Sequence, residues 1–585
     1  MRKLEAGSWR LEAGGRGACR RVAGSLQPPA FSIQPTGTLR IILALFATLA
    51  LAAGEARGTV LLTLSGDLAL RPSEGFLGGG DPSLHDVTSK LRDALTAGEP
   101  RIVLDLSRGF AGGLAAAEEI ASVLRERGPG KRVACLLDRV GDPALVIAAA
   151  CDEVVMPAAG VLAVHGLAAE GWYLAPALSR VGVRFHAVAS GEFKTAPESF
   201  TRDGPSDAAR AEMRQLLEGM DRVLVSLAAR PGLDAQGLAK ARAEGLQTGQ
   251  AAAALGLVAE AVEPGAWLAA QPAPLRRVRF GADVPDLSSF AGMMRFWGQL
   301  LGSDTGARPA RSVAVVELAG MIVPGERSMP GDTVADGDTC ALLDRLRDDR
   351  RVAAVVLRID SSGGDATASD RIHHAVRRLD EVKPVVCLMD GVAASGGYWI
   401  ACAAREIRVH RATITGSIGA FAMIPDLQGA ADLLGVRRHV ELAAPHGALM
   451  SPFGWTEERA VVYRRVIAEV DDRFRRLVAQ RRNLPRERVD ALAQGRIYTG
   501  DQAVAERLAD GFGTLASAVA RARGFAGEAA PLPLERFPKG NGLAARLGLV
   551  DATAFIPGAR RIAVWSEQAR RGPLILAWDG IPAIR

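Results

Sequence analysis

The strongest constraint on the fold is an internal repeat, in which a series of short segments recurs at a shift of about 252 residues. Each segment contains a run of mostly aliphatic and β-branched residues, which is the composition of a buried strand. The matched pairs are 59–68 with 312–322, 101–113 with 355–364, 131–138 with 383–390, 151–157 with 404–410, and 183–188 with 436–442. A chain that repeats in this way is expected to fold as two similar domains.

Stretches of helical character separate the strands of each copy. Residues 114–127 and 366–379 are rich in Ala and Leu and lie between predicted strands. Strands that alternate with helices predict an α/β fold of repeated ββα units, with mostly parallel sheets covered by helices. Two further segments, 206–227 and 455–482, space their apolar residues about 3.6 apart and are predicted to be amphipathic packing helices.

The repeat also suggests domain boundaries. We place the first domain at 58–270 and the second at 311–525. The stretch 271–310 contains Pro272, Pro274, Pro285 and a Gly/Ser/Asp-rich piece, and is expected to be a linker. Residues 526–585 carry Pro/Gly punctuation and two apolar fragments, and the sequence assigns them to no domain.

The amino-terminal part of the chain has the composition of a membrane-targeting segment. Residues 1–40 carry seven Lys or Arg against two Glu, and residues 41–53 read IILALFATLALAA. This run suits the apolar region of a signal peptide better than a full span of about 20 residues. The long basic stretch is instead typical of an uncleaved anchor with a cytoplasmic amino end. We expect a cytoplasmic leader over 1–40 and a transmembrane anchor over 41–57, with a cleaved signal segment as the alternative.

Charge and cysteine content argue against several kinds of partner. The leader contributes +5 of the net charge of +6, so the body is nearly neutral. The body has no basic stripe interleaved with aromatics, and we expect no nucleic acid as partner. The six cysteines form no CxxC pair and no zinc-ligand spacing, so neither a metal site nor a disulfide framework is expected.

His373 and His374 lie on a predicted polar helix face and are expected to be solvated.

The segment DGVAASGGYWIACAA, which begins at Asp390, carries the clearest chemical signal. An apolar strand over 385–389 runs into a small-residue turn and then into an apolar stretch, so Ser395 lies at a strand-to-helix junction. Backbone N–H groups and the helix dipole stabilise developing negative charge there, and Gly396 and Gly397 would admit a substrate carbonyl. A serine at a helix start is also a common N-cap. This segment alone leaves both roles open.

Two glycine-rich turns accompany this segment. Residues 360–365, DSSGGD, follow a predicted strand, and their turn could aim the N–H of Gly363 into a cleft as an oxyanion donor together with that of Gly396. A plain strand-to-helix turn is the alternative, and no GxxxxGK[ST] phosphate loop is present. The third turn, TGSIG over 415–419, is close enough in sequence to return to the same sheet edge.

Together ASGGYW, the Gly-Gly turn before it and TGSIG resemble the signal peptide peptidase A (SppA) group of serine proteases, peptidase family S49, in its long tandem-duplicated bacterial form. The first copy contains GEFKTAPESF over 191–200, which resembles the general-base segment of that family. The resemblance extends from about residue 59 to about residue 525. It implies two tandem ClpP/crotonase-like ββα superhelix domains, a homotetrameric assembly and no cofactor.

The resemblance also implies site residues. Ser395 corresponds to the nucleophile, Lys194 to the general base, and Ser417 to a residue that orients the lysine; Gly363 and Gly396 fall at the oxyanion donors. A base other than histidine is chemically reasonable, because the eight histidines offer no candidate Ser-His-Asp set. A lysine can serve when burial leaves it neutral.

The two copies each retain one member of this dyad. In the first copy the position that matches Ser395 falls at Pro143, and in the second the position that matches Lys194 falls near His446 or Gly447. One complete site per chain would therefore be assembled across the two copies.

We therefore expect a membrane-anchored Ser/Lys endopeptidase that degrades cleaved signal peptides and other membrane-associated peptides. Its expected location is the bacterial inner membrane, with the catalytic body on the periplasmic side. A crotonase-type acyl-CoA enzyme and a non-catalytic membrane scaffold are the alternatives, since fold alone does not fix chemistry. Both dyad members and the export leader favour the protease. The sequence leaves open the preferred side chains at the cleaved bond, the natural substrate and removal of the leader.

Overall fold

The computed structural model describes residues 58–66, 68, 82–280, 293, 309–326 and 333–538, and the backbone of 575–578. The predicted leader over 1–40 and anchor over 41–57 lie outside these residues. Among the helices described, none has both the length and the apolar character needed to cross a membrane.

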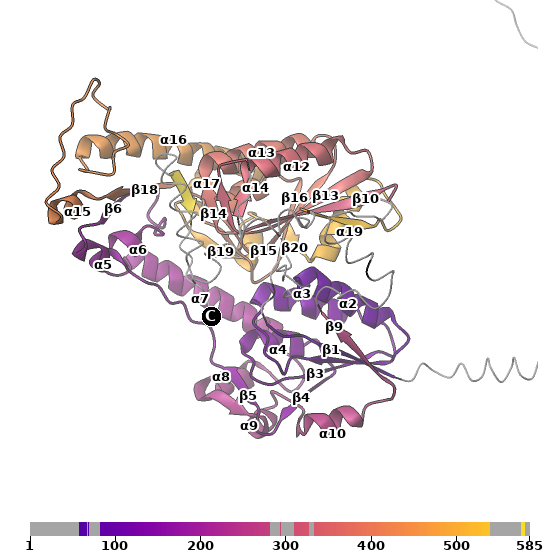
Figure 1. The fold of residues 1–585 in the computed structure, drawn as a ribbon. Coiled ribbons are helices and arrows are strands. Elements are labelled where there is room, and N and C mark those ends of the chain that lie inside the picture. Colours follow the sequence, from indigo (N-terminus) through magenta and orange to yellow (C-terminus); the bar gives the residue numbers. More distant parts are fainter. Residues whose placement is uncertain are drawn as a thin grey trace, which may run out of the picture. The chain divides into compact units, whose positions relative to one another are not determined.

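The first half is built on a parallel six-stranded sheet (Figure 1). Its strand order is β8 (Glu260–Val262), β4 (Glu153–Pro157), β3 (Arg132–Leu136), β2 (Arg101–Asp105), β1 (Thr59–Thr63) and β9 (Leu275–Arg279). Apolar side chains on one face of these strands form the main core of this half. Burial on both faces explains why the strands read as continuous aliphatic runs rather than alternating ones.

Helices cover both faces of this first sheet. The core side is packed by α2 (Leu84–Thr96), α3 (Leu114–Arg125), α4 (Asp142–Ala148), α7 (Asp207–Ala228), α8 (Ala235–Glu244) and α9 (Gly249–Ala254). The opposite face packs against α10 (Pro264–Ala269). Capping residues mark where helices begin. Helix α2, for example, starts with a capping box in which the side chains of Ser83 and Asp86 accept each other's backbone N–H groups. A short antiparallel pair, β5 (Val161–Val164) with β7 (Gly245–Thr248), lies beside this sheet.

The second half repeats the plan with a longer sheet. The order is β19 (Ile497–Thr499), β17 (Ile414–Gly416), β15 (Val385–Ala394), β13 (Val352–Ser361), β10 (Ser312–Ala319) and β21 (Leu534–Phe537), while β16 (Glu406–Val409) pairs with β15 and with β20 (Gly511–Phe512). All these pairings are parallel except β17 with β19. The prediction of mostly parallel sheets covered by helices is confirmed.

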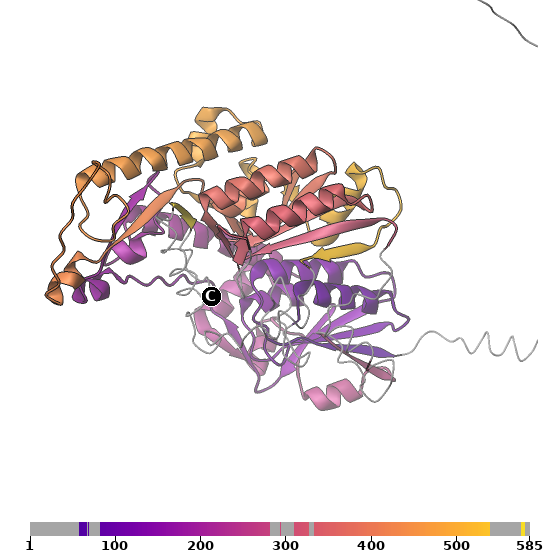
Figure 2. The same ribbon diagram turned by 45° about the horizontal axis from the view of Figure 1, so that its top comes forward.

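The helices of the second half again cover both faces. They are α12 (Asp336–Asp348), α13 (Ala366–Asp380), α14 (Gly396–Ala401), α15 (Gln428–Leu433), α16 (Glu457–Arg482), α17 (Arg486–Leu492), α18 (Gly500–Ala505) and α19 (Leu515–Phe525). Helices α12, α13 and α14 share the larger core, and α19 packs on the other face of the sheet. In the turned view of Figure 2, the red helices of this half lie over its strands. The predicted helices over 114–127, 206–227, 366–379 and 455–482 correspond to α3, α7, α13 and α16.

A third sheet contains strands from both halves. Its order is β12 (Thr333–Ala335), β11 (Met321–Val323), β14 (Gly363–Asp365), β22 (Ile575–Trp578), β18 (Phe421–Asp426) and β6 (Arg184–Ala189). Strand β6 comes from the first half and pairs antiparallel with β18 over six residue pairs, from Phe421 opposite Ala189 to Asp426 opposite Arg184. Two short helices, α5 (Ala175–Arg180) and α6 (Glu198–Thr201), flank β6. This ladder joins the halves through main-chain hydrogen bonds.

Three sequence expectations differ from the structure. The segment 436–442, matched to β6 by the repeat, is not a strand but an exposed loop, because the partner that makes β6 a strand belongs to the other half. Within the expected linker 271–310, residues 275–279 form β9, an edge strand of the first sheet; likewise β21 lies in the unassigned region after 525. His373 is buried rather than solvated, with its Nδ1 2.8 Å from the carbonyl oxygen of Trp399, while His374 is exposed.

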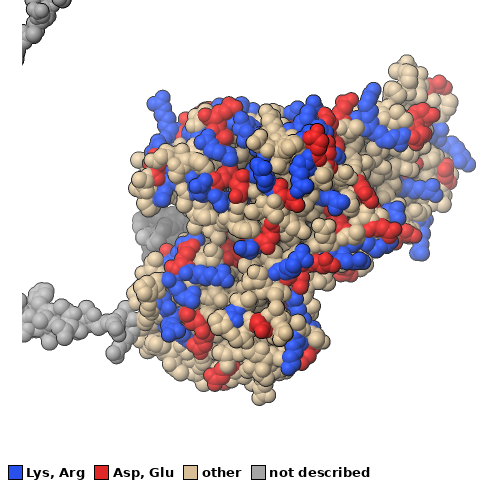
Figure 3. Space-filling view, turned by 180° about the vertical axis from the view of Figure 1, so that it is seen from behind, with Lys and Arg blue, Asp and Glu red and all other residues tan. Residues whose placement is uncertain are grey.

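The described surface mixes both signs of charge. Figure 3 shows Lys and Arg side chains interspersed with Asp and Glu over the face it presents. This mixture agrees with a nearly neutral body and gives this face no extended basic stripe.

Candidate active site

Ser395 lies at the junction between β15 and α14, as the sequence predicts. Its backbone has φ +53° and ψ −116°, a region that costs a non-glycine residue on the order of 1–3 kcal/mol. The side chain is fully buried and makes no capping hydrogen bond to α14. The alternative role of Ser395 as a helix cap therefore does not describe its side chain.

Packing behind α14 holds this strained turn in place. The Trp399 ring stacks on Phe474 of α16 at a centroid distance of 4.4 Å, and the Tyr398 hydroxyl donates to the carbonyl of Leu508 at 2.9 Å. The Ser395 N–H donates to the carbonyl of Gly416 at 2.8 Å. These contacts fix both ends of the turn.

Lys194 reaches Ser395 from the first half of the chain. Its Nζ lies 2.9 Å from Ser395 Oγ, 2.7 Å from Ser417 Oγ and 3.0 Å from the Ser417 carbonyl oxygen. Lys194 is 3% exposed and Ser417 is 1% exposed, so the amino group of Lys194 is enclosed by protein rather than by water. Ser395 and Ser417, which follow Lys194 by 201 and 223 positions in the sequence, thus meet at its Nζ atom.

The loop after α17 holds the lysine segment against the second half. The Phe193 N–H donates to the carbonyl of Gln494 at 2.9 Å, and the Arg496 guanidinium lies 3.7 Å from the centre of the Phe193 ring. The backbones approach so closely that a Cβ on Gly495, which has φ +86°, would lie 2.4 Å from the backbone nitrogen of Lys194. Glycine is required at such a position both by its φ and by the space available.

The two predicted oxyanion glycines lie beside each other. A Cβ on Gly396 would lie 3.3 Å from the Cα of Gly363 and 2.5 Å from Ser369 Oγ. The N–H of Gly396 is in the first turn of α14, where no intrahelical acceptor exists. The N–H of Gly363 instead donates to Ser361 Oγ at 3.2 Å, and would have to exchange this bond for one to a substrate oxygen.

Strand β22, near the end of the chain, runs beside this turn. It pairs antiparallel with β14, where Trp578 lies opposite Gly363, and with β18, where Leu576 lies opposite Phe421. Strands β14 and β18 therefore both pair with β22 along the edges that face each other, and one extended chain fits between them.

Sequence reasoning missed a set of buried charged residues between the halves. They are Glu119, Arg358, Asp390 and His410. Two of them carried a recognisable signal: Glu119 lies on the buried face of α3 together with Ala115 and Val123, and Arg358 interrupts an apolar strand. A charge at a position where the period predicts an apolar side chain is the pattern that would have found them.

Comparison with known proteins agrees with this geometry. A model of peptidase family S49 matches residues 126–265 and 377–527, one stretch in each half. Protease 4 of Salmonella typhi is 31% identical over 492 residues, which cover 80% of this chain and 78% of that protein. Protease 4 of Haemophilus influenzae is 30% identical over 448 residues, covering 72% of this chain and 69% of that protein.

The chain belongs to peptidase family S49. It is a serine protease of this family, and its two S49 regions correspond to the two halves described above. Among solved structures, a mutant of ClpP1 from Listeria monocytogenes covers 35% of this chain and 93% of its own, at 15% identity and a TM-score of 0.24.

The close approach at Gly495 gives a prediction for this S49 peptidase. We expect Gly495→Ala to displace Lys194 and to lower kcat at least 100-fold, because a shift of about 1 Å at a reacting group costs about that much. Gly232→Ala is the matched control: Gly232 has a similar φ of +87°, but a Cβ there meets no atom within 4 Å. Peptidase assays and thermal denaturation of both variants separate displacement from backbone strain. Equal kcat values in the two variants would contradict the assignment.

Proposed function

We propose that this S49 peptidase is an endopeptidase that uses Ser395 as nucleophile and Lys194 as general base. The observation that carries the proposal is the distance of 2.9 Å between Lys194 Nζ and Ser395 Oγ in a buried site. A serine hydroxyl needs an adjacent base to attack an amide. Burial disfavours a charged amine in general, and a neutral lysine can accept the hydroxyl proton.

The reaction follows from this arrangement. Ser395 Oγ forms a bond to the carbonyl carbon of the peptide while its proton passes to Nζ of Lys194. The C–N bond then breaks, the leaving amine takes the proton, and an acyl-enzyme ester remains on Ser395. Lys194 next takes a proton from water as the water oxygen bonds to the acyl carbon. The bond between that carbon and Ser395 Oγ then breaks, and Lys194 returns the proton to Ser395 Oγ. Ser417 orients Nζ in both steps through its hydroxyl and carbonyl oxygens.

The substrate oxygen would be stabilised by backbone N–H groups. Gly396 offers an N–H at the start of α14, and Gly363 offers a second on β14 when it leaves Ser361. Backbone donors of this kind stabilise the developing oxyanion. A crotonase-type acyl-CoA enzyme could also use two such donors, but membership of family S49 and the Ser/Lys contact favour peptide hydrolysis.

The position of β22 supports a mode of peptide binding. An extended peptide in its place would form main-chain hydrogen bonds with β14 and β18, which is strand addition to a sheet edge. Main-chain hydrogen bonds can bind peptides of many sequences, and pockets for side chains add a preference for some of them. This mode suits an enzyme that degrades varied peptides.

The finer features of the proposal rest on the sequence resemblance. We propose that the substrates include cleaved signal peptides and other membrane-associated peptides, and that each half has the ClpP/crotonase-like superhelix of the family. We also propose that the basic leader and apolar segment over 1–57 anchor the protein in the bacterial inner membrane, with the catalytic body on the periplasmic side.

A homotetramer is the assembly we propose, and the repeat supports it. In the first half, β6 pairs with β18 of the second half. The second-half counterpart of β6 is the loop 436–442, whose side chains Val436, Val440 and Leu442 are exposed. The first-half counterpart of β18 is residues 168–173, where Trp172 is 72% exposed. The same pairing between neighbouring copies gives a head-to-tail contact, which closes into a ring.

Substitution of the dyad tests the catalytic proposal. We expect Ser395→Ala and Lys194→Ala each to abolish peptide hydrolysis, with kcat lowered by about 10³-fold or more. Lys383→Ala is a matched control, because Lys383 Nζ also donates to main-chain carbonyls but Lys383 precedes β15, at the end of the strand opposite to Ser395. The measurements are peptide hydrolysis and covalent labelling by a serine-directed phosphonate, followed by peptide mapping. Label on a residue other than Ser395, or wild-type kcat in Lys194→Ala, would overturn the dyad.

Removal of β22 tests the binding mode. We expect a chain that ends at residue 570 to show a several-fold lower KM for peptide substrates at unchanged kcat, because the groove is no longer occupied by its own strand. A synthetic peptide of residues 571–585 should then raise the apparent KM of this shortened chain, and a scrambled peptide of the same composition should not. A shortened chain with a raised KM or a lower melting temperature would show that β22 is a structural strand instead.

The proposed assembly makes Trp172 an interface residue. We expect Trp172→Glu to lower the mass measured by light scattering from that of a tetramer to that of smaller species, because a charge is costly in an apolar contact. Leu246→Glu is the control, since Leu246 is 65% exposed and lies in β7, outside the matched segments. Tetramers in both variants would contradict the proposed contact.

A further inference from the structure

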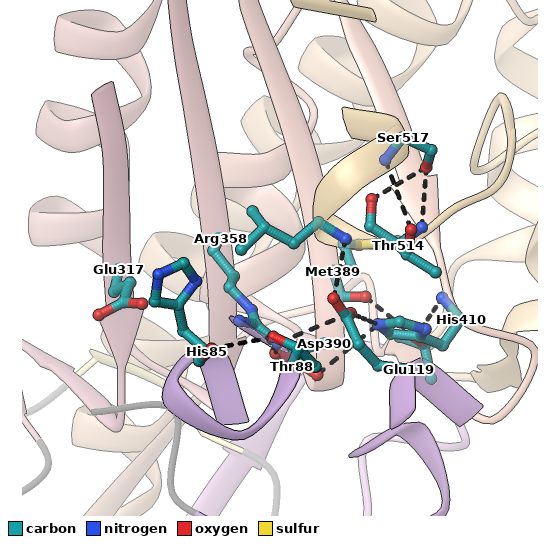
Figure 4. A network of polar contacts seen from close by, with 12 residues as sticks. His85, Thr88, Glu119, Glu317, Arg358, Met389, Asp390, His410, Thr514 and Ser517 are labelled. Carbon is teal, nitrogen blue, oxygen red and sulfur yellow. Dashed lines mark hydrogen bonds and ion pairs between the residues drawn. The ribbon is translucent and has the colours of Figure 1, made fainter. Parts of the chain in front are cut away.

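A buried cluster of four charged side chains lies between the two halves (Figure 4). Glu119 comes from α3 of the first half, whereas Arg358 of β13, Asp390 of β15 and His410, just after β16, come from the second. Asp390 is 4% exposed and the other three are fully buried. In Figure 4 the purple ribbon of the first half brings Glu119 up against the other three.

Each cation of the cluster faces both carboxylates. Arg358 Nε and Nη2 lie 2.6 Å from Asp390 Oδ2, and Nη2 lies 3.8 Å from Glu119 Oε2. His410 Nε2 lies 3.1 Å from Glu119 Oε2 and 3.8 Å from Asp390 Oδ1. When His410 is protonated, the two positive charges balance the two carboxylate charges, and the net charge of the four side chains is zero.

The surroundings keep His410 charged. Burial alone would lower the pKa of His410, but the contact with Glu119 and the charges of Glu119, Asp390 and Glu118 raise it to about 9. Burial alone would raise the pKa of Glu119, but His410 and Arg358 lower it to about 2. The nearby Glu317 on β10 faces Arg358. The pKa of His85 on α2 is lowered to about 4, mainly by burial and to a smaller extent by the charge of Arg536. His85 therefore stays neutral.

The cluster lies on the strands that end at the catalytic site. Asp390 precedes Ser395 by five residues on the strand that runs into it, and Arg358 is on β13, which ends at Ser361 just before Gly363. Glu119 ties both strands to the first half, and its second oxygen accepts the N–H of Leu515 at 3.1 Å. The neighbouring Glu118 accepts backbone N–H groups of Arg411 and Ala412.

Stability alone does not account for such a cluster. Buried ion pairs lose their hydration, and apolar residues of similar volume often serve stability as well or better. What fixed charges supply is a single geometry, because each carboxylate must meet its cation for the group to remain neutral. A site whose two reacting groups come from different halves depends on such a fixed geometry.

We propose that Glu119 is a positioning residue, which through His410, Asp390 and Arg358 fixes β15 and β13 so that Ser395 meets Lys194 of the first half. This inference rests on the proposed Ser/Lys mechanism. It assigns to α3 a part in catalysis that acts through these two strands rather than through contact with the substrate.

A pH dependence follows from the state of His410. Its folded pKa of about 9 lies above the ordinary value of 6.5, so its contribution is complete below about pH 6.5 and is lost as pH rises through about 9. Above that pH the cluster carries an uncompensated negative charge. The fixed position of Ser395 is then lost.

The test compares full-length Glu119→Gln with Glu118→Gln, which removes the same charge one residue away but keeps all four side chains of the cluster. We expect Glu119→Gln to lower kcat about 10- to 100-fold with KM changed less than about twofold, and Glu118→Gln to stay within about threefold of wild type. The rate of Ser395 labelling by a serine-directed phosphonate, followed from pH 6 to 10.5, should decline above about pH 9 in wild type. In Glu119→Gln this decline should move to lower pH, because His410 loses the contact that holds its proton.

The double variant Glu119→Gln/His410→Gln removes one charge of each sign and so keeps the cluster neutral. We expect it to fold, to lose no more kcat than Glu119→Gln alone, and to lack the decline near pH 9, because the two residues act as a pair. Wild-type kcat in the double variant, additive losses, or an alkaline decline that persists in it would overturn the proposal. These outcomes are distinct from failure of the dyad, which Ser395→Ala reports by itself.

Discussion

The contact between Lys194 and Ser395 is the interaction on which the rest of the structure depends. It joins two atoms at 2.9 Å across 201 residues of sequence, and each belongs to a different copy of the repeat. Proline stands at the first-copy position matched to Ser395, and the second-copy position matched to Lys194 falls in the loop around His446. Neither half can supply both groups, so in the proposed mechanism the catalytic unit is the pair of halves, and their relative placement is itself a catalytic requirement.

Several independent features fix that placement. The β6–β18 ladder joins the halves by main-chain hydrogen bonds close to the lysine segment. Gly495 lets the loop after α17 pack directly on the backbone of Lys194. Farther from the dyad, the cluster around Glu119 ties α3 to the strands that carry Ser395 and Gly363. The first two act on the proposed base and the third on the proposed nucleophile, so both partners of the contact are held.

The two serines that meet Lys194 share an unusual backbone. Ser395 has φ +53° and Ser417 has φ +50°, in a region that side chains seldom adopt. Both follow strands that pair with each other, since β15 ends at Ala394 opposite Gly416 of β17. Strain of this kind persists only where the surroundings hold it, and it is found most often at functional sites. Here it turns two hydroxyls from neighbouring strands toward one nitrogen atom.

The sequence by itself determined what depends on local pattern. The repeat, the parallel α/β plan, the helices over 114–127 and 366–379 and the junction at Ser395 follow from periodicity and turn residues over a few positions. Lys194 was found through family resemblance, because an isolated lysine has no local signature. The tertiary structure alone decided that β6 is a strand while its counterpart 436–442 is a loop, that His373 is buried, and that Glu119 meets His410. Each of these depends on a partner far away in the chain, and a local pattern holds no information on which distant surface will cover it.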